Sequence, residues 1–190
     1  MIAFNIDGVR IDCFEAFSLI KQTNTFSIML HLHIFTDGSV NTQLKVGYGA
    51  YLVVSERVTS IQSLKDKVKV KRFEQTSSTK LELQTLLWAL DETIALANGD
   101  DMTLTVYTDS QNIIGLPRRR ARLEQNNYFS SKNRRLNNYE LYQEFYRLTA
   151  KLNCQFVKVI GHQASSKKDE IDKLFGLVDQ ASRRALREDY

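Results

Sequence analysis

Hydrophobic positions in the first half of the chain predict three β-strands. Residues 28–37 form an almost continuous apolar run that ends at Asp37, which is typical of a buried strand, and Gly38 and Ser39 are expected to break it. A second strand is predicted over Val46–Val54. Lys67–Lys71 alternates lysine and valine, as expected for an exposed edge strand that charged side chains protect from pairing with other chains. Together these segments predict an antiparallel meander.

The second half of the chain alternates between helical and strand patterns. A helical stripe runs from Leu83 to Ala97, and Leu104–Asp109 predicts a fourth strand. A strand–helix–strand crossover favours a parallel pair, so this strand should lie beside the first. Two further helices are expected around Leu141–Leu152 and Ile171–Ala185, with a fifth strand at Phe156–Ile160 between them. The predicted class is therefore mixed α/β, a five-stranded mixed sheet flanked by helices.

Residues 1–27 do not fit this pattern and are interpreted as an N-terminal extension before a single domain over residues 28–190. Asn5-Ile6-Asp7-Gly8 is a candidate hairpin turn, but the segment has no assigned role. No apolar run reaches the roughly 20 residues of a membrane span, and acidic residues interrupt any signal-peptide core. Two distant cysteines indicate no disulfide framework, so the expected setting is the reduced cytoplasm.

Positive charge is concentrated in one segment. The chain carries +4, whereas residues 117–135 alone hold seven basic side chains and one acid, a net +6, which leaves −2 for the rest. A local basic patch suggests a polyanionic partner. A solvated loop that keeps the protein soluble explains the charge equally well when this segment is considered alone.

Four acids are candidates for chemistry. Asp37 and Asp109 each follow a predicted strand, and adjacent parallel strands would place them where they can share a ligand. Glu82 and Asp179 lie beside the apolar stripes of two helices and so face the sheet margin. Four converging carboxylates repel one another unless hard cations lie between them. Oxygen ligands suit Mg²⁺ or Mn²⁺, and two such ions form the clamp used for phosphodiester displacement.

Each acid also has a simpler interpretation. Thr79-x-x-Glu82 fits a capping box at a helix start, Asp179 could pair with Arg183 one turn on, and Asp37 and Asp109 could be turn residues. Taken singly, each acid is better explained in this way than by a catalytic role. Jointly, these interpretations must explain two acids at strand ends and two on core-adjacent helix faces, and this coincidence favours the catalytic hypothesis.

The order of several short motifs resembles type 1 ribonuclease H over roughly Leu30–Leu186. The motifs are Thr36-Asp37-Gly38-Ser39, Gly47-Tyr48-Gly49-Ala50, Thr79-Lys80-Leu81-Glu82-Leu83, Tyr107-Thr108-Asp109-Ser110-Gln111, Gly161-His162, and Asp179 before Ala181 and Arg183. The resemblance implies the ribonuclease H-like fold and an endonuclease that cuts the RNA strand of RNA–DNA hybrids with two metal ions. It assigns Asp37, Glu82, Asp109 and Asp179 as metal ligands, and His162 as the family's mobile-loop histidine that assists proton transfer or product departure.

The same resemblance implies a substrate-binding surface. The family often carries a basic protrusion after the Asp-Ser-Gln strand, and the arginines of residues 118–135 occupy that place. Backbone groups at Gly38 and Ser39 would lie near RNA 2′-hydroxyls. Ser78 stands where amide side chains are common in the family, and the loop after His162 is longer than usual. The implied substrate-binding residues are Gly38, Ser39, Ser78, Gln111, Arg118, Arg119, Arg120, Arg122, Arg134 and Arg135.

The sequence leaves two alternatives open. A nuclease of the same fold could act on another nucleic acid, although proofreading exonucleases carry an acid two residues after the first aspartate, where this chain has Ser39. A non-catalytic hybrid-binding module is the other alternative, although all four acids are intact. The expected partner is an RNA–DNA hybrid. No membrane partner is expected, and the expected oligomeric state is a monomer.

Overall fold

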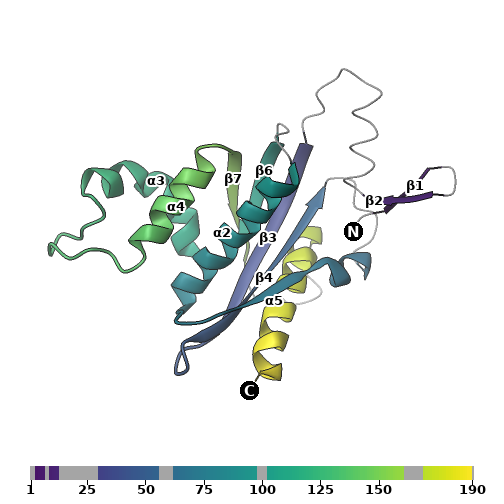
Figure 1. The fold of residues 1–190 in the computed structure, drawn as a ribbon, viewed down its shortest axis with the longest axis horizontal. Coiled ribbons are helices and arrows are strands. Elements are labelled where there is room, and N and C mark those ends of the chain that lie inside the picture. The colour runs from purple at the N-terminus through teal and green to yellow at the C-terminus, as the bar shows by residue number, and fades with distance from the viewer. Residues whose placement is uncertain are drawn as a thin grey trace.

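The computed structural model describes residues 3–6, 9–12, 30–55, 62–97, 102–160 and 169–189 (Figure 1). A five-stranded sheet forms its centre, with the strand order β5-β4-β3-β6-β7. Its strands are β3 (Leu30–Asn41), β4 (Val46–Ser55), β5 (Lys69–Phe73), β6 (Met102–Thr108) and β7 (Asn153–Lys158). β3 pairs antiparallel with β4 and parallel with β6, so the predicted mixed sheet and the parallel pair are confirmed.

The first strand is longer than its apolar run predicted. The prediction that it ends at Asp37 is wrong, because β3 continues through Gly38 and Ser39 to Asn41 and forms a long hairpin with β4. Its parallel pairing with β6 nevertheless stops at Phe35. Asp37 therefore lies just beyond the parallel part of the sheet while its backbone stays paired to β4. Hairpin pairing with β4 keeps the strand extended where sequence pattern alone suggested a break.

The lysine-rich edge strand begins slightly later than predicted. A 3₁₀ helix, η1 (Gln62–Lys67), precedes it, and the strand itself starts at Lys69. Because β5 pairs only with β4, it forms the edge of the sheet, and its residues from Lys69 to Arg72 are exposed. The predicted edge position is confirmed.

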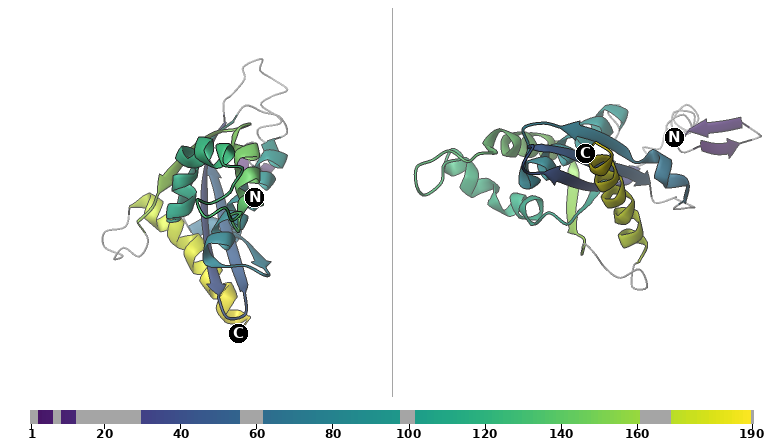
Figure 2. Two further views of the ribbon diagram at one scale, coloured as in Figure 1. Left: turned by 90° about the vertical axis from the view of Figure 1, so that its left-hand side faces the viewer. Right: turned by 90° about the horizontal axis from the view of Figure 1, so that it is seen from below.

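Helices cover both faces of the sheet (Figure 2). α2 (Ser78–Ala97) and α4 (Tyr139–Thr149) share one hydrophobic core with the side chains of Leu32, Ile34, Leu104 and Val106. α5 (Glu170–Glu188) packs on the opposite face, where Phe35, Ala50, Leu52 and Val54 form a second core with Leu64, Leu174 and Val178. Alternate side chains of β3 point to opposite faces, which explains why Ile34 and Phe35 belong to different cores.

One helix was not predicted. The basic segment at residues 117–135, for which no helix was predicted, begins inside α3 (Gln111–Gln125), which carries four of its arginines. Its apolar side chains Ile113, Leu116 and Leu123 are buried, and Ser110 caps its start. Pro117 lies inside the helix, and proline is a strong signal against a helix interior. Only residues 126–138, between α3 and α4, form a loop.

The N-terminal extension contains the predicted hairpin. β1 (Ala3–Ile6) pairs antiparallel with β2 (Val9–Asp12), with Ile6 opposite Val9. The remainder of residues 1–27 lies outside the described residues. Within the described part of the chain, none of the helices has the length and apolar character that crossing a bilayer requires.

Candidate active site

Asp37 and Asp109 come from neighbouring strands at one end of the parallel pair. Asp37 lies on β3 two residues after the last parallel pair, and Asp109 follows directly after β6. Both side chains are half-buried. Burial, together with the negative charges of Asp109 and Asp179, raises the pKa of Asp37 from 3.8 to about 6. The charges of two other predicted acids therefore reach the carboxylate of Asp37.

Ser182 is a polar contact of the site that sequence reasoning missed. This α5 residue is fully buried, and its Oγ lies 2.9 Å from Oδ2 of Asp37 and 3.0 Å from the backbone oxygen of Asp179. A hydroxyl has one proton to donate, and a carboxylate is the stronger acceptor. The hydrogen bond opposes the effect of burial on the pKa of Asp37. The sequence gave no signal for this role of Ser182, because a serine within a predicted helix is common.

Glu82 is oriented by a second serine. On α2, its half-buried carboxylate accepts a hydrogen bond from Oγ of Ser110, which also accepts from the backbone N–H of Ile113 and caps α3. Burial raises the pKa of Glu82, the Ser110 bond lowers it, and the charge of Asp109 raises it. The capping-box alternative is wrong, because α2 already begins at Ser78 and the carboxylate points to Ser110.

Three glycines allow α2 to approach the hairpin closely enough to place Glu82. A Cβ atom on Gly38 would lie 2.9 Å from the Leu81 side chain, and one on Gly47 would lie 2.6 Å from it. At Gly49 the clash is more severe, because a Cβ atom would lie 1.9 Å from Oγ1 of Thr85. The approaching groups are mainly side chains of α2.

Asp179 has two interactions at once. Nε of Arg183 lies 2.7 Å from its Oδ1, so the predicted helical ion pair is present. Both groups are partly exposed, and such pairs contribute little to stability. The charge of Asp179 still raises the pKa of Asp37. Pairing with Arg183 therefore does not remove Asp179 from the site.

The carboxylates are not arranged as a closed metal cage. Among the described residues, no group of three or more histidine, cysteine, aspartate or glutamate side chains is placed to hold an ion. Mg²⁺ usually keeps several waters and binds through one or two carboxylates together with substrate phosphates. No lysine or arginine pairs with Asp37, Glu82 or Asp109 in the described part of the chain. An all-oxygen, uncompensated donor set of this kind fits a hard cation.

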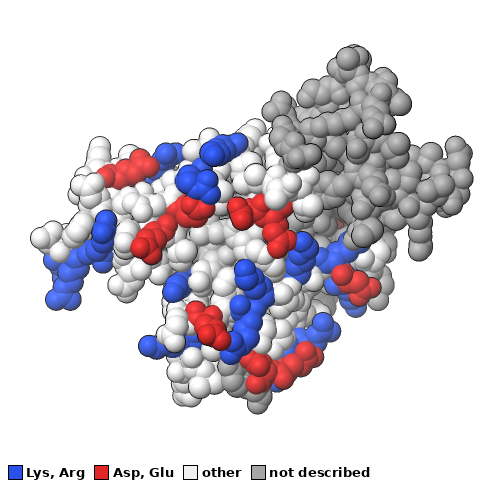
Figure 3. Space-filling model, viewed as in Figure 1, with Lys and Arg blue, Asp and Glu red and all other residues white. Residues whose placement is uncertain are grey.

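The arginines of the basic segment fall into two groups. Arg119 bonds Asn112 and the backbone of Gly115, Arg120 pairs with Glu124, and Arg135 lies over the rings of Phe129 and Tyr139. The prediction of one free basic protrusion is therefore corrected. The exposed side chains without such contacts within the described residues are those of Arg118, Arg122 and Arg134. Figure 3 shows basic side chains at the outer end of the α3–α4 loop.

The remaining predicted substrate residues lie around the acids. Ser78 is exposed at the start of α2, and Ser39 contacts Ser182 at 3.4 Å between hydroxyls. Gln111 is exposed at the start of α3, where its Oε1 accepts a 2.8 Å hydrogen bond from Nζ of Lys158. His162 lies outside the described residues.

Comparison with known proteins identifies the family of the chain. The family model described as RNase H matches residues 30–180. Ribonuclease H of Caldicellulosiruptor saccharolyticus is 24% identical over 163 residues, which cover 84% of this chain and 99% of that protein. Among solved structures, LC9-RNase H1, a type 1 RNase H with the type 2 active-site motif, superposes with a TM-score of 0.64 at 15% identity, covering 87% of this chain and 76% of that one. LC11-RNase H1 in complex with an RNA/DNA hybrid superposes with a TM-score of 0.52 at 18% identity, covering 82% of this chain and 99% of that one. The family model spans most of the chain, and the chain therefore belongs to the RNase H family.

Proposed function

We propose that this protein hydrolyses the RNA strand of RNA–DNA hybrids and uses two Mg²⁺ ions, for which Mn²⁺ could substitute. The observation that carries the proposal is the electrostatic grouping of Asp37, Glu82, Asp109 and Asp179 around the end of the parallel strand pair, without a lysine or arginine paired to the first three within the described residues. Membership of the RNase H family supports the same conclusion.

Asp37, Glu82 and Asp109 would hold the metal ions, and Asp179 would join them. When bound, such ions activate a water molecule and stabilise the leaving 3′-oxygen. Two serines support the carboxylates, since Ser182 fixes Oδ2 of Asp37 and Ser110 fixes Oε2 of Glu82. Fixing these oxygens before substrate arrives limits the reorganisation that metal and phosphate binding require. His162 is proposed to assist proton transfer or product departure.

The substrate would bind beside the four acids. LC11-RNase H1 was solved with an RNA/DNA hybrid, and we extend that substrate to this chain. Arg118, Arg122 and Arg134 are exposed and would contact DNA-strand phosphates. Gln111 would contact a base edge, Ser78 would lie near the substrate at the α2 start, and the backbone of Gly38 and Ser39 would meet the RNA 2′-hydroxyls. Arg119, Arg120 and Arg135 would support this surface through their contacts within the chain.

Cleavage of a labelled RNA–DNA hybrid tests the proposal. We expect Mg²⁺-dependent cleavage by the natural sequence, with 5′-phosphate products, and a loss of at least about 100-fold in Asp109→Asn. Asp66→Asn is the matched control, because Asp66 is an exposed acid on η1. Equal cleavage by Asp109→Asn and the natural sequence would refute the site assignment.

Parallel substrates separate the alternatives. Preferential cleavage of duplex DNA or a four-way junction would indicate another nuclease of this fold. Tight hybrid binding without turnover in Mg²⁺ or Mn²⁺ would indicate a binding module. All four carboxylates come from one chain, so we also propose that it acts as a monomer, in the cytoplasm.

A further inference from the structure

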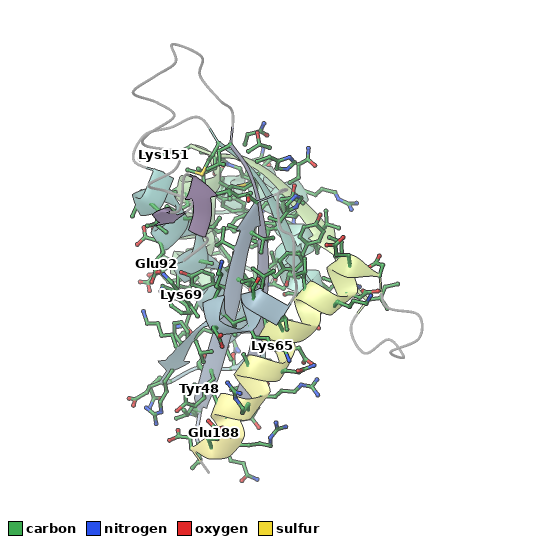
Figure 4. All side chains as sticks on the ribbon, turned by 90° about the vertical axis from the view of Figure 1, so that its right-hand side faces the viewer. Tyr48, Lys65, Lys69, Glu92, Lys151 and Glu188 are labelled. Carbon is green, nitrogen blue, oxygen red and sulfur yellow. The ribbon has the colours of Figure 1, made fainter. Side chains whose placement is uncertain are left out.

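A second basic site lies on α5, away from the acids. A cleft of about 280 Å³ opens between α5 and the end of η1, together with the residue that joins η1 to β5. Three of its lining side chains are cationic, one is an amide and three are apolar. The residues are Lys65, Val68, Leu177, Gln180, Ala181, Arg184 and Arg187. Figure 4 shows Lys65 beside the ribbon of α5.

The cleft and the proposed active site occupy different flanks of α5. Residues 177, 180, 181, 184 and 187 recur at helical spacing and form one stripe. At 100° per residue, Asp179 lies about 140° around the helix from the middle of that stripe. Ser182 points into the core toward Asp37 between the two flanks. A ligand in the cleft would therefore not compete with the carboxylates for the same space.

The cations of the cleft are left largely uncompensated by the fold. Lys65 and Arg187 are exposed, and their side chains have no ion-pair partner within the described residues. Arg184 approaches Glu188 only at 3.8 Å, with both side chains about 70% exposed, so that pair is weak. Like charges around a hollow repel one another and focus a positive potential into it. An anion placed there relieves the repulsion.

The rest of the lining narrows the class of anion. Val68, Leu177 and Ala181 give the cleft an apolar wall, which a small inorganic ion would not use. Gln180 adds an amide that both donates and accepts hydrogen bonds, as the edge of a base requires. Two arginines provide the planar donors that recognise phosphate oxygens. The volume is near the lower limit of small-molecule sites, so it suits a single nucleotide unit.

We propose that this cleft binds a nucleotide phosphate, with the phosphate at Lys65, Arg184 and Arg187 and the sugar or base against the apolar wall. The nucleotide could be free or one unit of a single strand, because both present the same chemistry. The proposal does not rest on the hybrid cleavage proposed above.

Site-resolved NMR titration of the full chain in metal-free buffer tests the proposal. Adenosine monophosphate, a thymidine hexanucleotide and a hexaglutamate peptide are the three probes. We expect either nucleotide probe to shift the backbone amides of Val68, Leu177 and Ala181. Binding of adenosine monophosphate indicates a free-nucleotide site, and binding of the hexanucleotide alone indicates a strand site.

Paired variants separate a specific site from general charge attraction. Lys65→Ala/Arg187→Ala should weaken nucleotide binding at these amides by about tenfold or more. Lys151→Ala/Lys173→Ala removes the same charge from exposed positions outside the cleft lining and should change the affinity less than about twofold. Hybrid cleavage should be equal in both double variants. Equal weakening by the two double variants, equal binding of hexaglutamate, or no shift at the cleft with either nucleotide would overturn the proposal.

Discussion

The raised pKa of Asp37 predicts that Asp37→Asn stabilises the metal-free protein. Burial and the charges of Asp109 and Asp179 outweigh the Ser182 hydrogen bond and raise the pKa from 3.8 to about 6. Each pKa unit corresponds to about 1.4 kcal/mol. At pH 7 the ionised carboxylate therefore destabilises the folded state by about 3 kcal/mol, as an upper limit. Asparagine is uncharged and still accepts a hydrogen bond from Ser182.

The sign of this effect fixes a pH window. Between pH 4 and pH 6 the folded protein holds a proton on Asp37 that the unfolded chain has lost, so stability falls as pH rises and then levels off above pH 6. From pH 5 to pH 7 the natural sequence should lose about 1 kcal/mol more than Asp37→Asn. Glu92 does not disturb this window. Its pKa is lowered to about 2, because the hydrogen bonds from Lys69, Tyr51 and Trp88 outweigh burial. Its protonation therefore changes the stability of the protein only below the unfolded pKa near 4.5.

Urea denaturation in EDTA measures this difference across about pH 5 to 7.5. We expect Asp37→Asn to be the more stable protein throughout and the gap to widen with pH. Added Mg²⁺ should stabilise the natural sequence more than the variant, because a ligand that binds only the folded state stabilises it. A variant that is less stable at pH 7, or a gap that is constant with pH, would contradict the burial and charge environment assigned to Asp37.

Three further predictions concern the support of the site and its charge. Ser182→Ala should lower kcat by about tenfold and move the acidic limb of the pH–rate profile upward, because the aspartate loses a hydrogen bond that lowers its pKa; an unchanged profile would exclude a positioning role. Gly49→Ala should destabilise the protein by about 1–3 kcal/mol in urea, because the new Cβ atom meets Thr85. Arg122→Ala should reduce the slope of log affinity against log salt for a hybrid by about one, whereas Arg120→Ala, whose side chain is already paired, should change it less.

The parts of the fold that sequence predicted are those where one strong periodic signal acts alone. The apolar stripes of α2 and α5 and the lysine alternation of β5 are local patterns, and the structure has two helices and an edge strand there, although β5 begins two residues later than predicted. The grouping of the four acids was predicted from the strand and helix patterns together with the parallel pairing that a strand–helix–strand crossover favours. Elements of this kind need no knowledge of their tertiary partners.

Sequence failed where a distant partner decides the local structure. Asp37 looks like the end of a strand because Gly38 follows it, yet pairing with β4 carries β3 four residues further. α3 contains Pro117 and a run of arginines, and the burial of Ile113, Leu116 and Leu123 against the core helps to stabilise it as a helix. Its amphipathic pattern was present in the sequence, but the high charge of the same residues concealed it.

Tertiary contacts also decide which arginines are bound within the chain and which are available to a substrate. Charge counted along the sequence treats residues 118–135 as one basic surface, whereas helix geometry separates side chains one residue apart by 100°. Arg119 and Arg120 therefore reach Tyr142, Tyr146 and their own helix, while Arg118 and Arg122 remain available to a polyanion. In the cleft on α5, folding instead brings cations together, since Lys65 and Arg187 are distant in sequence but line the same cleft. A surface that binds phosphate is defined by which cations lack an internal partner, and folding rather than composition determines that.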